Sequence, residues 1–129
     1  MSKFQLARKA VKFRSEIPRL LDRMANNAVY QFKVVNFDAK GFVDGSVKAW
    51  KPNKVNTGHQ QLVDTGRMRE SIRVLGKSFN SRLVGSDVPY APFHNSGTER
   101  LPQRKFVGNS KQLEVKNGKL LMQVIKSIV

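Results

Sequence analysis

Cysteine is absent from the sequence, so disulfide bonds, thiolate catalysis and zinc sites built on cysteine are all excluded. The two histidines, His59 and His94, lie far apart in the chain, and neither belongs to a motif with metal-ligand spacing. The phosphate-binding motifs G-x-x-x-x-G-K-[ST] and G-x-G-x-x-G do not occur either. We therefore expect no catalytic residues, no cofactor and no metal site.

Long hydrophobic runs are also missing. No apolar stretch approaches the ~20 residues that a membrane-spanning helix needs. Charged residues interrupt the N-terminal segment every few positions, which is unlike the apolar centre of a secretory signal. At 129 residues the chain has the usual length of a single domain. We expect one globular domain over residues 1–129, without membrane contact, that works in the compartment where it is made.

Acidic residues are few, since 9 Asp and Glu stand against 24 Lys and Arg, which gives a net charge of +15. Such an excess implies an acidic partner, and nucleic acid is the first candidate. The positive charges are spread along the chain, however, with seven between Lys3 and Arg23 and seven between Arg100 and Lys126. A subunit of a large assembly that faces acidic neighbours would have the same composition, so the charge leaves both alternatives open.

The clearest helical pattern lies in the first third of the chain. Apolar residues repeat at helical spacing from Leu20 to Val35, and Pro18 suits the first turn of this helix, where its missing N–H needs no partner. Before it, residues 1–17 form a basic arm with the pattern of a shorter amphipathic helix. This arm is either a solvated helix or a partner-binding element. Its candidate contact residues are Arg8, Lys9 and Lys12.

A turn-rich segment follows this helix. The pair Asp44-Gly45 predicts a small hairpin that places Phe42, Val47 and Trp50 against the core. Trp50 is the only tryptophan, and we interpret it as a buried plug rather than as a platform for a ligand.

A short helix is predicted near the middle of the chain. Asp64 or Thr65 can cap its first turn by accepting a backbone hydrogen bond. Met68, Ile72 and Leu75 then continue one apolar face of this helix.

Two strands and a last helix complete the predicted fold. The strands are joined by a tight turn at Asn80-Ser81. Apolar residues between Leu120 and Ile128 repeat at helical spacing, and Asn117 is a plausible cap for this helix. We therefore predict an α+β fold, in which a long N-terminal helix, a short central helix and a C-terminal helix pack around a small antiparallel sheet, with long loops.

Residues 86–106, SDVPYAPFHNSGTERLPQRKF, concentrate polar side chains in one short run. Ser86, Asp87, His94 and Ser96 are the residue types from which a serine hydrolase builds its nucleophile, base and orienting carboxylate. The G-x-S-x-G motif of one large hydrolase class is absent, and no pocket or oxyanion donor is indicated. We therefore interpret this stretch as a docking loop for a partner.

Within this docking loop, the prolines favour an extended chain, because a residue before proline is kept out of the helical region. Tyr90 and Phe93 are expected to anchor the loop to the body of the protein, and Gly97 to permit a turn. His94 is expected to fix the loop or to form a hydrogen bond across an interface. The candidate partner-binding charges of the loop are Arg100, Arg104 and Lys105.

Four motifs follow one another along the chain: FDAKGFVDGSVKAWKP, LVDTGRMRESI, VGSDVPYAPFHNSGTE and LPQRKFVG. Together they resemble the Mu-type phage virion morphogenesis family, whose relatives include tail-completion proteins of long-tailed phages. The resemblance covers nearly the whole chain, with departures at Val43, Met68 and Lys105, where the family often has proline, leucine and proline. The residues that match its motifs are Asp64, Thr65, Gly66, Arg67, Ser71, Ile72, Gly85, Pro89, Tyr90, Ala91, His94, Gly97, Pro102, Arg104 and Phe106.

This resemblance implies a small structural protein without enzymatic activity, located in the virion and assembled in the cytoplasm of the bacterial host. Its expected place is the head-proximal end of the tail or the neck that joins head to tail. The family further implies a homo-oligomer that forms a ring, such as a hexamer. It also implies contacts with other neck, connector or tail-tube proteins, and incidental contact with packaged DNA. The alternative from the charge alone is a basic nucleic-acid-binding module.

Overall fold

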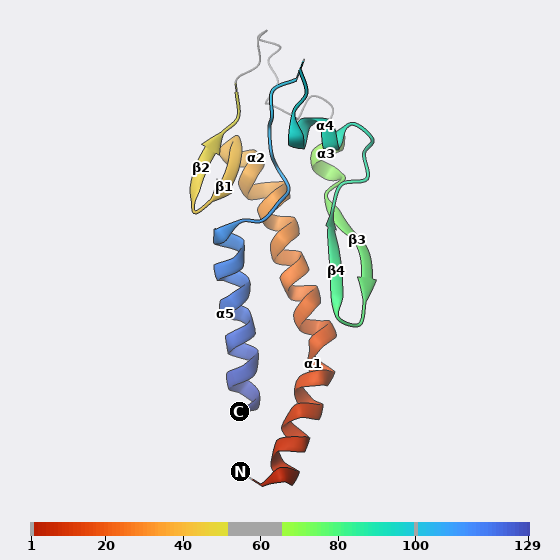
Figure 1. The fold of residues 1–129 in the computed structure, drawn as a ribbon, viewed down its shortest axis with the longest axis vertical. Coiled ribbons are helices and arrows are strands. Elements are labelled where there is room, and N and C mark those ends of the chain that lie inside the picture. Colours follow the sequence, from red (N-terminus) through yellow and green to blue (C-terminus); the bar gives the residue numbers. More distant parts are fainter. Residues whose placement is uncertain (1, 52–65, 100) are drawn as a thin grey trace.

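The computed structural model describes residues 2–51, 66–99 and 101–129. A long helix, α1 (Lys3–Tyr30), continues through a π-helical segment, η1 (Gln31–Val35), into the short helix α2 (Asn36–Ala39). In Figure 1 this continuous rod runs along most of the length of the molecule. The predicted α+β fold is confirmed.

The start of α1 is fixed by a capping box at Ser2. The Ser2 hydroxyl accepts a hydrogen bond from the backbone N–H of Gln5, and the Gln5 side chain accepts one from the backbone N–H of Ser2. The helix boundary predicted at Pro18 was wrong, because α1 passes through this residue. An interior proline costs a helix about 3 kcal/mol. Helix α1 packs along helix α5 and strand β4, and tertiary packing of this kind is the main source of helix stability in a folded protein.

A hairpin follows α2, as predicted from Asp44-Gly45. Strand β1 (Gly41–Asp44) pairs antiparallel with β2 (Ser46–Ala49), and Gly45 turns the chain with φ of 73°. Phe42 and Trp50 are buried as expected. The prediction for Val47 was wrong, since its side chain is 53% exposed. The outer strand of a two-stranded sheet has little for such a side chain to pack against.

The middle of the chain holds one helical turn and a second hairpin. Helix α3 (Arg67–Glu70) is followed by β3 (Arg73–Ser78) and β4 (Ser81–Gly85), which pair antiparallel. The tight turn between them is at Phe79-Asn80, one residue earlier than predicted, because Ser81 already pairs with Ser78. Leu75 lies in β3, so its predicted place on a helical face was wrong, because the helix ends after Glu70. Gly66 precedes α3 in a left-handed conformation. The predicted caps Asp64 and Thr65 lie outside the described residues.

Helix α4 (Ala91–Ser96) lies within the docking loop, and helix α5 (Lys111–Ile128) ends the fold. The extended chain predicted at Ala91-Pro92 was wrong, because Pro92 occupies the first turn of α4, where proline is tolerated. Helix α5 begins earlier than predicted. Its cap is Ser110, whose hydroxyl accepts from the backbone N–H of Leu113, whereas Asn117 lies inside the helix and accepts a hydrogen bond from Asn27.

The elements surround α1. Helix α5 runs antiparallel beside α1, the β3–β4 hairpin lies along the other side of α1, and the β1–β2 hairpin sits near the start of α5 (Figure 1). Phe37 is fully buried and meets the rings of Trp50 and Phe106 edge-on at centroid distances of 5.2 and 6.0 Å. No helix in the described ranges is long and apolar enough to cross a membrane. The main buried cluster comprises Ala28, Phe32, Phe37, Trp50, Met68, Ile72, Val88, Ala91 and Phe106.

Candidate docking loop and basic helix

The first residues of the docking loop have structural partners. The hydroxyl of Ser86 lies 2.5 Å from the hydroxyl of Ser71 and accepts a hydrogen bond from the backbone N–H of Val88 at 3.2 Å. The carboxylate of Asp87 pairs with Arg73 at the surface, 2.5 Å from its guanidinium. Ser86 therefore connects the end of α3 to the loop, and Asp87 connects the loop to β3.

His94 is held within the docking loop by contacts of its backbone and of its ring. Its backbone carbonyl accepts a hydrogen bond from the backbone N–H of Arg104 at 2.8 Å, and its ring meets Tyr90 edge-on at 6.0 Å. Burial lowers the pKa of His94, and the positive charge of Arg104 lowers it further. Folding therefore shifts His94 toward the neutral imidazole, compared with a histidine in the unfolded chain.

Several residues of the family motifs lie in the core. Ile72, Ala91 and Phe106 belong to the main buried cluster, and Gly85 is buried as well. Arg67 is exposed on α3, where it has contacts of its own. Two further motif residues lie in the loop: Pro89 is exposed, and Pro102 is half-buried. The loop is therefore fixed to the body by apolar residues that come from three separate parts of the chain.

Arg104 is buried, with 9% of its surface exposed, which differs from the predicted role as a partner-facing charge. Its Nε and Nη2 atoms donate to the backbone carbonyl of Lys51 at 3.1 and 2.9 Å. The neighbouring Lys105 places its Nζ 4.6 Å from the ring centroid of Phe42 and remains partly exposed. Arg100 lies outside the described residues. Of the two predicted charges that the structure describes, Arg104 is thus buried and Lys105 reaches the surface.

Gly97 closes the loop at a point that only glycine fits. It has φ of 78° and ψ of 162°, a conformation that side chains strongly disfavour. A Cβ atom built on Gly97 would lie 3.0 Å from the backbone N and 3.1 Å from the Cα of Gln103. The chain after α4 therefore returns directly against the segment that carries Arg104.

Two aromatic side chains of the docking loop, Tyr90 and Phe93, are exposed, whereas Phe106 at its end is buried. Phe93 is 56% exposed, and Tyr90 and Leu101 are each exposed by more than a third. The prediction that Tyr90 and Phe93 anchor the loop was wrong, because Val88 and Ala91 fill the buried positions instead. The loop thus presents exposed aromatic surface beside buried residues that fix it to the body, which is typical of protein-binding surfaces.

The predicted basic arm is the first part of α1. Arg8 is exposed and lies 5.1 Å from the ring centroid of Phe4, while Lys9 is half-buried and Lys12 exposed. Phe4 is itself largely exposed, and so is Val11. This stretch is therefore a basic helix with uncovered apolar residues, as its sequence pattern indicates.

Two asparagines that hold the loop were missed by the sequence analysis. The Oδ1 atom of Asn95 accepts hydrogen bonds from the backbone N–H groups of Phe106 and Val107 at 3.0 and 3.1 Å. The fully buried Asn36 donates to the backbone carbonyl of Phe106 at 2.9 Å. Neither contact leaves a local sequence signal, because each joins segments that are distant in the chain or pass through a turn.

In the described part of the chain, no group of three or more His, Asp or Glu side chains is placed to hold a metal ion. Comparison with known proteins adds no relative, since no family model, no curated protein and no solved structure matches the chain. The proposals below therefore depend on the motifs and on the geometry of this structure.

Proposed function

We propose that this protein is a non-enzymatic structural subunit of a tailed-phage virion, which completes the head-proximal end of the tail or joins the tail to the head in the neck. The observation that carries the proposal is the ordered set of four motifs along nearly the whole chain. In the structure, the motif residues Ile72, Ala91 and Phe106 pack into one core, and Gly97 sets the course of the loop. Residues that build the core and shape the docking loop are what a structural subunit needs to present a surface to its partners.

The surfaces available for assembly agree with this proposal. The docking loop exposes Tyr90, Phe93 and Leu101 at one end of the molecule, and the basic part of α1 lies toward the other end (Figure 1). A subunit with separate surfaces at its two ends can contact both like subunits and different neighbours. We propose a homo-oligomer, a ring such as a hexamer, that contacts other neck, connector or tail-tube proteins of the virion.

Removal of the protein from an otherwise complete phage tests this proposal. Electron microscopy of the resulting particles should show heads and tails that fail to join, or tails with defective head-proximal ends. A copy of the gene supplied in trans should restore joined particles. Normal infectious particles without the protein would contradict the proposal.

A basic nucleic-acid-binding module is the second candidate, because the net charge is +15 and α1 presents exposed basic residues such as Arg8, Lys12 and Arg14. Binding through phosphates releases counterions, so the affinity should fall steeply with salt. Titration of duplex DNA at about 50 and 200 mM salt distinguishes this candidate. Absence of measurable binding at the lower salt concentration would remove it.

A further inference from the structure

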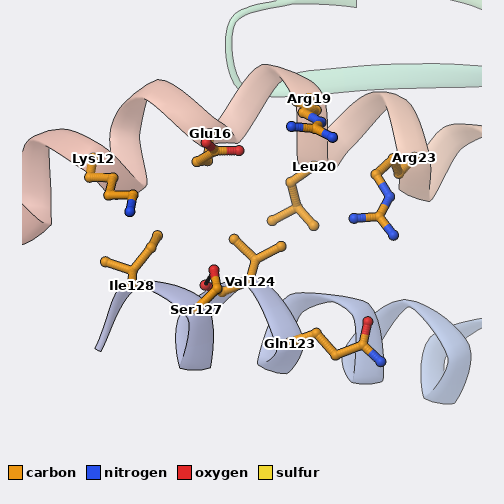
Figure 2. Close-up of a pocket in the computed structure, with 9 residues that line it drawn as sticks. All are labelled: Lys12, Glu16, Arg19, Leu20, Arg23, Gln123, Val124, Ser127 and Ile128. Atoms are coloured by element: carbon orange, nitrogen blue, oxygen red, sulfur yellow. Dashed lines mark hydrogen bonds between the residues drawn. The ribbon is translucent and has the colours of Figure 1, made fainter.

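A groove of about 340 Å³ lies between the middle of α1 and the last turns of α5 (Figure 2). It lies along the helices, away from the docking loop at the opposite end of the molecule (Figure 1). The α1 residues that line it are Lys12, Glu16, Arg19, Leu20 and Arg23, and the α5 residues are Gln123, Val124, Ser127 and Ile128.

The floor of the groove is apolar. Leu20 of α1 points toward α5, and Val124 and Ile128 of α5 point toward α1 (Figure 2). Leu20 is buried, while Val124 and Ile128 are half-buried. Val124 and Ile128 therefore leave part of their apolar surface uncovered beside the buried Leu20, and a partner with an apolar face would gain free energy by covering it.

The rim of the groove is basic. Lys12 and Arg23 extend from α1 into the space beside α5 (Figure 2), and Arg19 lies between them along the helix. Glu16 is the one carboxylate in the lining. The groove thus combines three positive charges and one negative charge with an apolar floor.

These three cations make no ion pair with any residue that the structure describes. Among the residues that the structure describes, the carboxylates with a known ion pair have other basic partners. These pairs are Asp22 with Lys77 and Arg82, Asp38 with Arg69, Glu70 with Lys33, and Asp87 with Arg73. Lys12, Arg19 and Arg23 are therefore available to a ligand that brings negative charge.

The shape of the groove suits a helix. From Lys12 to Arg23, α1 extends for about 17 Å at 1.5 Å per residue, which is about three helical turns. Two antiparallel helices leave a groove along their contact, and the apolar face of a third helix packs into such a groove. We propose that this groove binds an acidic amphipathic helix of a partner protein, with its apolar side on Leu20, Val124 and Ile128 and its carboxylates at the three cations.

Charge and chemistry favour this occupant over two others. A second copy of the chain would bring its own net charge of +15 toward the same cations. A nucleic-acid backbone would pair with the cations but leave the apolar floor uncovered. The inference stands on the groove itself and does not depend on the proposed place of the protein in a virion.

Fluorescence anisotropy with the full chain tests this proposal. The probe is a labelled helical peptide of about 18 residues, long enough to span the groove, with leucine along one face and glutamate along the other. The comparison probe has the same composition in scrambled order. We expect saturable binding of the amphipathic peptide, weakened about tenfold or more by R19E/R23E, and several-fold by I128S, which removes apolar floor near the end of α5.

The matched control is K48E/K119E, which changes the net charge by the same amount at exposed residues outside the groove. We expect it to retain most of the affinity. Circular dichroism verifies the fold of each variant, and if charge reversal unfolds the chain, R19Q/R23Q is compared with K48Q/K119Q. Equal loss in both pairs, equal binding of the scrambled peptide, or no binding up to about 1 mM would overturn the proposal. So would a duplex DNA that displaces the peptide and shows the same sensitivity to R19E/R23E.

Discussion

Asn36 and Phe106 are joined by a hydrogen bond in the centre of the protein. The Nδ2 atom of Asn36 donates to the carbonyl oxygen of Phe106 at 2.9 Å, and the Oδ1 atom of the same side chain accepts from the backbone N–H of Val43 at 3.0 Å. Asn36 has no exposed surface. One side chain thus satisfies two buried backbone groups and connects α2 to the first hairpin and to the end of the docking loop.

We expect Asn36→Ala to lower the free energy of unfolding by about 2–4 kcal/mol, because it leaves the N–H of Val43 and the carbonyl of Phe106 buried without their partner. Urea denaturation measures this change. Asn26→Ala is the matched control, since Asn26 is exposed on α1 and its replacement should change stability by less than about 0.5 kcal/mol. A similar loss in both variants would show that Asn36 has no special role.

The burial of Asn36 could not be predicted from the sequence. An asparagine at the end of a predicted helix has the pattern of a solvated or terminal residue, and nothing local indicates that it is buried. Its burial depends on two segments that reach it from later in the chain, at Val43 and at Phe106. Such long-range pairings are set by tertiary packing, which a single sequence does not reveal.

Gly97→Ala should destabilise the protein by about 1–3 kcal/mol, because the backbone conformation at this position is essentially restricted to glycine. The new Cβ would also lie within 3.1 Å of the backbone of Gln103. Gly118→Ala should have the opposite sign, since Gly118 lies within α5 with no atom near an added Cβ, and alanine is favoured in helices by about 0.5–1 kcal/mol. Thermal unfolding of the two variants compares them directly, and a stabilising Gly97→Ala would contradict the expected strain.

Arg82→Lys should lower stability by about 1–3 kcal/mol. The side chain of Arg82 is only 8% exposed, and its guanidinium donates to the carboxylate of Asp22 at 2.8 Å and to the carbonyl of Pro18 at 3.1 Å. Lysine lacks the planar fork that reaches both acceptors. Arg73→Lys is the control, because its pair with Asp87 is more than half exposed and should contribute less than about 1 kcal/mol. Chemical denaturation measures both losses. Equal losses of stability in the two variants would show that Arg82 does not link the β3–β4 hairpin to α1.

Features that depend on neighbouring residues were predicted from the sequence, whereas features that depend on tertiary packing were not. The turn at Gly45 was predicted correctly, and the turn after β3 to within one residue, because a tight turn is encoded in two to four neighbouring residues. Pro18 and the exposed pair Tyr90 and Phe93 were misread, since their places depend on what packs beside them. The groove between α1 and α5 was not predicted at all, because it exists only where two ends of the chain meet.

His94 should make stability depend on pH. Burial, and then the charge of Arg104, hold the pKa of His94 below its ordinary value of 6.5. Because the unfolded chain then binds the proton more readily, the contribution of His94 is fully present above about pH 6.5 and is lost as the pH falls toward the lower pKa of the folded state. His94→Gln should therefore flatten the stability profile between about pH 7.5 and 5. A pKa at or above 6.5 in an NMR titration of the His94 ring would contradict this expectation.

Phe93 should matter for assembly and little for folding. Its ring is 56% exposed on α4, so Phe93→Ser removes apolar surface that the isolated chain does not bury. We expect this variant to fold with a free energy of unfolding within about 1 kcal/mol of the original, yet to fail to restore joined particles in a phage that lacks the gene. Phe79→Ser is the matched control, since Phe79 is 51% exposed at the hairpin turn away from the docking loop. Restoration of particles by both variants would mean that the docking loop is not an assembly surface, whereas failure of both would mean that exposed aromatic residues matter without regard to place.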